Sequence, residues 1–73
     1  MNQLVTFLRV LEGHDDQTVA ILNTSIILVV ESIAKPGHCT LHFNRTDWPP
    51  VLVVGPYVVI VGRINDSFLG VST

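Results

Sequence analysis

Cysteine is nearly absent from this 73-residue chain, which holds Cys39 alone, so an intrachain disulfide is excluded. Metal ligands are also few. Cys39, His38 and His42 share one short stretch, His14 stands apart, and no second cysteine completes a set of four ligands. We therefore expect neither a metal nor a cofactor. A chain this short buries only about 60% of the surface that its unfolded form exposes, and association with another subunit is the remaining source of stability.

Charge is also scarce: 14% of the residues are charged, against about 25% in an ordinary globular domain. The formal net charge is -2, and the strong cations are only Arg9, Lys35, Arg45 and Arg63. High affinity for nucleic acid normally requires several phosphate contacts. Nucleic acid is therefore an unexpected partner, although weak binding through base stacking stays open.

Long apolar runs are missing as well. The N-terminus lacks a basic start followed by an apolar run of signal length, because Arg9 interrupts the run. The longest apolar stretches, around residues 26–30 and 51–61, are shorter than the ~20 residues of a membrane helix. We expect a soluble, cytoplasmic protein with no membrane partner.

Hydrophobic residues are abundant, at 48% of the chain. So much apolar surface is difficult to hide inside one chain of 8.0 kDa. The composition favours a homo-oligomer or a subunit of a larger assembly. The alternative is a monomer with a tight barrel core and many half-exposed Val and Ile side chains.

Val and Ile dominate these apolar positions, while Gly and Pro recur at intervals, which is typical of strands and turns. We predict a mainly β fold, one domain over residues 1–73, built as a twisted sheet or partly open barrel of about five to seven short strands. The expected strands are Leu4–Leu11, Thr18–Leu22, Ile26–Ala34, Cys39–Asn44, Val51–Val54 and Phe68–Val71.

The segment Tyr57–Ile64 is compatible with two structures. Its β-branched run favours a buried strand. It also follows Gly55-Pro56, and proline is common at the first helical position, so a short C-terminal helix is the alternative. The next residues, Asn65–Ser67, are predicted to form a turn.

Three similar tetrapeptides, LNTS, FNRT and INDS, place Asn23, Asn44 and Asn65 at intervals of 21 residues. Such a period suits a repeated strand-turn-strand unit, and chance is the alternative, because the residues between them match poorly. The triplets are formal glycosylation acceptors, which we interpret as turns.

Catalytic chemistry has little support. Cys39 and His38 are neighbours on a predicted strand, so their side chains point to opposite faces, and Asp15 and Asp16 lie in a predicted exposed turn. The glycines form no phosphate-binding motif. We expect a protein that is not an enzyme.

Trp48 is the one aromatic residue that lies in a polar segment, NRTDWPP. Beside Arg45 and two prolines it is a candidate contact residue, since Trp and Arg are enriched at interface hot spots. Alternatively, it folds back as a lid over an open barrel end.

Parts of the chain, FLRVLEG, ILNTSIILVVES and CTLHF, resemble short FlbD-like bacterial proteins of flagellar loci. The matching residues are Arg9, Gly13, Leu22, Asn23, Ile27, Val30, Glu31, Thr40 and Leu41. The resemblance implies a strand-turn-strand layout, which is similar to that of LytTR-type DNA-binding domains. The chain departs from it in a longer loop after Gly13, in DWPP, and in YVVIVGRI, which replaces a charged C-terminal helix. No DNA-binding role is carried over.

A second resemblance leads to a different function. The segment PYVVIVGRIND looks like a strand in small OB-like subunits of single-strand binding complexes such as replication protein A. In that case Trp48, Tyr57 or His42 would stack on bases. Our first expectation is a protein interaction or assembly module whose contacts include Trp48, Arg45, Tyr57 and His42, with a second copy or another protein subunit as the partner.

Overall fold

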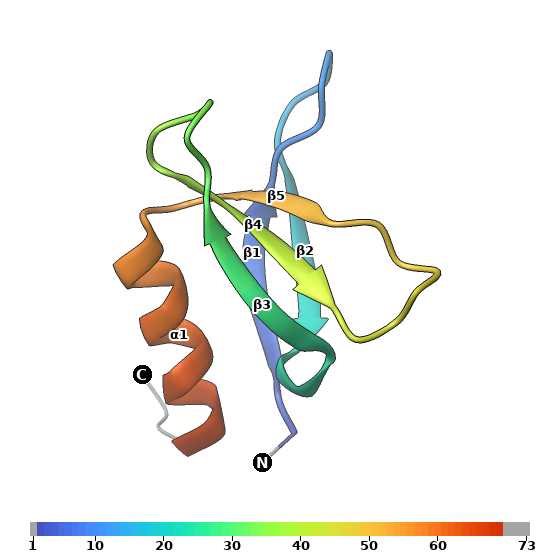
Figure 1. Ribbon diagram of the computed structural model, residues 1–73, viewed down its shortest axis with the longest axis vertical. Coiled ribbons are helices and arrows are strands. Elements are labelled where there is room, and N and C mark those ends of the chain that lie inside the picture. Colours follow the sequence, from blue (N-terminus) through green and yellow to red (C-terminus); the bar gives the residue numbers. More distant parts are fainter. Residues whose placement is uncertain (1, 70–73) are drawn as a thin grey trace.

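The computed structural model describes residues 2–69 and shows one five-stranded antiparallel sheet followed by one helix (Figure 1). This confirms the mainly β fold and gives five strands. The elements in chain order are β1 (Leu4–Arg9), β2 (Gln17–Leu22), the 3-10 turn η1 (Asn23–Ser25), β3 (Ile26–Glu31), β4 (His38–Phe43), β5 (Val51–Val54) and α1 (Tyr57–Leu69).

The sheet is built from a hairpin and a meander. The strand order is β2-β1-β5-β4-β3, so β1 and β2 form the hairpin, and β3, β4 and β5 form the meander. The two parts meet where β1 pairs with β5, at Arg9 opposite Val53. The sheet is therefore open, with β2 and β3 as its two edges.

One face of the sheet, the inner face, carries the core. Alternation along the strands turns Phe7 of β1, Leu41 of β4 and Val53 of β5 to this side, and all three are buried. Helix α1 lies against it and adds Ile60 and Ile64. We call the part beneath the helix the covered half of the inner face.

The helix corrects our preference for a strand over Tyr57–Ile64 and for a turn at Asn65–Ser67, and it confirms the alternative. Gly55, at a φ of 140°, breaks the chain away from β5. The carbonyl of Pro56 then accepts the amide of Ile60 at 3.1 Å, which starts the helix. The buried residues, Ile60, Ile64 and Ser67, recur at helical spacing, so packing overrides the β preference of the run.

Two further expectations change with the helix. Phe68 and Leu69 end α1 and do not begin a strand, while residues 70 and 71 of that expected strand lie outside the described residues. The three asparagines do not mark a repeat either. Asn23 lies in η1, Asn44 follows β4 and Asn65 is helical.

Asn23 ties the helix to the sheet. Its side chain is fully buried, and its Oδ1 accepts the amide of Gln3 at 3.2 Å. Its Nδ2 donates to Oγ of Ser67 at 2.9 Å, and that hydroxyl donates to the carbonyl of Ile64. One side chain of η1 therefore links α1 to Gln3, the residue that leads into β1. Such a buried polar group is stabilising only while all of its partners stay in place.

Candidate binding site

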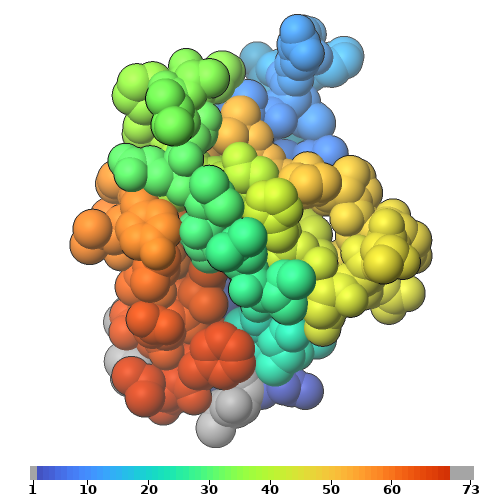
Figure 2. Space-filling view, viewed as in Figure 1, coloured from blue at the N-terminus to red at the C-terminus, as the bar shows by residue number. Residues whose placement is uncertain are grey.

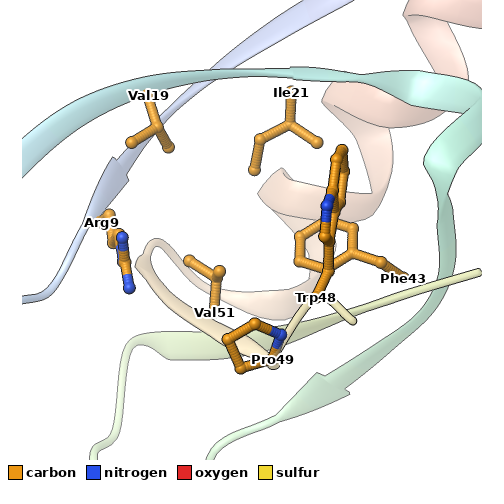
Figure 3. Close-up of a pocket in the computed structure, with 7 residues that line it drawn as sticks. All are labelled: Arg9, Val19, Ile21, Phe43, Trp48, Pro49 and Val51. Atoms are coloured by element: carbon orange, nitrogen blue, oxygen red, sulfur yellow. The ribbon is translucent and has the colours of Figure 1, made fainter. Parts of the chain in front are cut away.

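The rest of the inner face is open and forms an apolar pocket of about 210 Å³ beyond the covered half (Figure 3). We call it the Trp48 pocket. Strands β1, β2, β4 and β5 and the loop after β4 all contribute to its wall. The lining residues are Arg9, Val19, Ile21, Phe43, Trp48, Pro49 and Val51.

The loop between β4 and β5 holds Trp48 beside the pocket. The Trp48 ring meets Phe43 edge to face, with 5.5 Å between the ring centroids. The guanidinium of Arg45 lies 5.1 Å from the centre of the Trp48 ring, and its Nε donates to Asp47 at 3.4 Å. Trp48 is still 43% exposed to solvent. Trp48 therefore borders the pocket, as Figure 3 shows, and keeps much of its surface free for contact.

Arg9 is the one cation of the pocket wall. It follows Val5 and Phe7 at alternate positions of β1, so the strand turns all three to the inner face. Among residues 2–69, no carboxylate lies within ion-pair distance of Arg9, and the ion pair present is Arg45 with Asp47. The pocket thus presents an apolar wall with one positive charge on it.

The structure brings together two of the four predicted contact residues, Trp48 and Arg45. His42 follows Leu41 on β4, where alternation turns it to the outer face, and it lies opposite Leu28. Tyr57 begins α1 and does not line the pocket. The sequence reasoning missed Arg9, and the signal was its place in the alternating pattern Val5, Phe7, Arg9.

The cysteine is arranged as a core residue. Cys39 is fully buried, and its Sγ donates to the carbonyl of Gly55 at 3.4 Å. Burial, and after it the negative charge of Glu31, raises the pKa of the thiol above its ordinary value of 9.0. A protonated, buried thiol is a poor nucleophile. Across the described part of the chain, no three potential metal ligands cluster.

Apolar side chains also lie exposed on several surfaces of the molecule, whose front face is shown in Figure 2. They occur on the hairpin, on β3 and the loop after it, and along the outer side of α1. Besides Trp48 and Tyr57, the large apolar residues that are exposed are Leu4, Leu8, Leu22, Ile27, Leu28, Val30, Ile33, Val58, Val59, Phe68 and Leu69. Within residues 2–69, no helix has the length and apolar character to span a bilayer.

The fold and the pocket define a small antiparallel β domain with one covering helix and an open apolar site. No family model matches the chain, and neither curated proteins nor solved structures gave a match.

Proposed function

We propose that this chain is a non-catalytic protein interaction module that assembles with itself. The observation that carries the proposal is the Trp48 pocket, because it leaves an apolar wall open on the same face as the core. A half-exposed tryptophan at such a wall is typical of the anchors that dominate binding energy at protein interfaces.

The exposed apolar residues of the β1–β2 hairpin support the same proposal. Soluble monomers rarely expose large contiguous apolar patches, and such patches mark interaction sites. Here Leu4 and Leu22 face each other across the hairpin on its outer side, and both are exposed. A second copy has the same composition and supplies the same kind of surface in return, so self-association hides apolar area on both chains.

The first test is the solution mass, measured by light scattering over a wide range of protein concentrations. We expect a stable multiple of 8.0 kDa that dissociates only on strong dilution. A mass of one chain at every concentration would overturn the proposed self-association.

The second test asks whether the Trp48 pocket takes part. Trp48→Ala is expected to weaken self-association by at least about 10-fold, since hot-spot truncations typically cost 2 kcal/mol or more. Tyr57→Ala is the matched control, because Tyr57 has the same exposed fraction of 43% and does not line the pocket. Equal weakening by both variants, or by the control alone, would remove the pocket from the interface. Circular dichroism verifies that both variants fold.

A further inference from the structure

The two edges of the sheet differ in how well they are protected from pairing with another chain. Edge β3 has an irregularity between Ile26 and Leu28, and it ends in the charged Glu31. Bulges and charges are the usual means by which proteins block edge-to-edge pairing. Edge β2, Gln17–Leu22, has a regular register and no proline, glycine or charge. Of the two edges, β2 is the one that can accept a strand.

The hydrogen bonds of the hairpin fix which groups of β2 point outward. The amide of Asn23 donates to the carbonyl of Gln3, the residue before β1, at 2.8 Å, and the pairing of Leu4 with Leu22 places these two residues opposite each other. Because bonded and non-bonded pairs alternate along an antiparallel ladder, Ile21, Val19 and Gln17 also bond to β1. The N–H and C=O groups of Thr18 and Ala20 and the N–H of Leu22 therefore point away from the sheet, while the Leu22 carbonyl accepts the Ser25 hydroxyl at 2.6 Å.

We infer that two copies pair β2 against β2, antiparallel, about a two-fold axis at Ala20; this rests on the proposed self-association. With the axis there, Ala20 faces its own copy, and Thr18 faces Leu22 of the second chain. The Ala20 pair exchanges two hydrogen bonds, and each Thr18–Leu22 pair adds one from the Leu22 amide to the Thr18 carbonyl, which gives roughly four across the interface. An axis moved by one residue along β2 leaves some of these outward groups without a partner in the second strand. The axis at Ala20 thus pairs every outward residue of β2 with another residue of the same set.

The side chains and charges agree with this register. On the inner face, Val19 lies opposite Ile21 of the second copy, so the two Trp48 pockets meet across the axis. The cations stay apart. Arg9 lies beside Gln17, and the two Gln17 positions are separated by about 20 Å along the paired strands, beyond the screening distance of roughly 8 to 10 Å. No like charges meet at the axis.

The area that a stable dimer requires explains why Trp48 belongs to the same interface. A standard interface hides about 800 Å² per chain, whereas the five paired residues of each β2 cover an edge only about 17 Å long and about 10 Å thick. The side chains that flank β2 must supply the rest. Trp48 is one of them, because it borders pockets that include Ile21 on the inner face and Leu22 at the end of the strand.

Disulfide trapping tests the register in the otherwise native chain. Ala20→Cys is expected to form a covalent dimer within minutes under copper-phenanthroline in air, because bonded pairs have Cα atoms about 5.5 Å apart, within disulfide range. Leu28→Cys, at an exposed position of β3, is the matched control and is expected to stay monomeric on a non-reducing gel. Thr18→Cys is expected to cross-link with Leu22→Cys when the two variants are mixed. Cys39 is buried and does not compete.

A charge at the axis gives an independent measurement. Ala20→Lys is expected to weaken self-association at least about 10-fold, since the two lysines face each other, while Leu28→Lys leaves it unchanged. Two results would overturn the β2 register while self-association stands, provided that the native chain associates. One is a covalent dimer of Leu28→Cys, and the other is no covalent dimer of either Ala20→Cys or Leu28→Cys. A native chain that is monomeric at all concentrations overturns both.

Discussion

The inner face of the sheet is completed in one half and left open in the other. In the covered half, Ile60 and Ile64 of α1 close over Leu41 and Val53, and all four are buried. In the open half, Ile21 and its neighbours are only partly buried and border the Trp48 pocket. The same alternating strands build both halves. What differs is the cover, so the covered half is expected to determine stability and the open half to determine binding.

Truncating one side chain in each half gives the largest expected contrast. Leu41→Ala, at a fully buried position, should lower the free energy of unfolding by about 3 kcal/mol, because it removes apolar contacts and leaves a cavity. Ile21→Ala removes an isoleucine that is already partly exposed, and it should cost less than half as much. Urea denaturation at a protein concentration where light scattering finds single chains measures both without a contribution from association. Equal losses would show that the two halves contribute alike to stability.

The junction between β5 and α1 should be nearly as sensitive. A Cβ added to Gly55 would lie 2.8 Å from Cδ1 of Ile60, and the φ of 140° at this position is one that residues with a side chain rarely adopt. Gly55→Ala is therefore expected to cost about 2 to 3 kcal/mol in the free energy of unfolding. Gly13 also has a positive φ but open space around it, so Gly13→Ala should lower the free energy of unfolding by only about 1 kcal/mol.

A double mutant separates the clash from the backbone strain at Gly55. Ile60→Val removes Cδ1, so the loss in Gly55→Ala combined with Ile60→Val should be smaller than the sum of the two single losses. Strict additivity would mean that the clash plays no part and that backbone strain explains the whole effect.

The Asn23 link should contribute somewhat less. Asn23→Ala leaves the amide of Gln3 without this acceptor and the Ser67 hydroxyl without its donor, inside the protein, at an expected cost of about 2 kcal/mol. Asn44→Ala is the matched control. Asn44 is exposed and bonds to the Thr24 carbonyl at 3.4 Å, so its loss should cost less than about 0.5 kcal/mol. Thermal unfolding of both variants would contradict this ranking if Asn44→Ala were the less stable.

The sequence predicts these two halves to different extents. Apolar runs and turn residues suffice for all five strands, although β1 and β3 end earlier than predicted, at Arg9 and Glu31. The β-branched residues of Tyr57–Ile64 favour a strand, whereas the helical spacing of Ile60, Ile64 and Ser67 agrees with the observed helix. Trp48 was found by its unusual setting.

The pocket itself was beyond the sequence for a physical reason. Its wall joins β1, β2, β4 and β5, and this requires β5 to return beside β1. No local pattern encodes that pairing. Arg9 shows the limit, since its alternation places it on the inner face without revealing whether helix or solvent covers that position.

The smallest expected effect lies at Cys39, where the covered half meets the end of β5. The folded chain holds the thiol proton more tightly than the unfolded chain, because burial and then Glu31 raise its pKa above 9.0. The sign follows: below this value both states keep the proton and stability is unaffected, whereas above it the unfolded chain ionises first and the free energy of unfolding falls. Urea denaturation at pH 7 and pH 10 should therefore show a larger loss for the native chain than for Cys39→Ala, which has no thiol to titrate. Equal losses would mean that the thiol ionises alike in both states, and that the covered half is less sealed at Cys39 than its burial indicates.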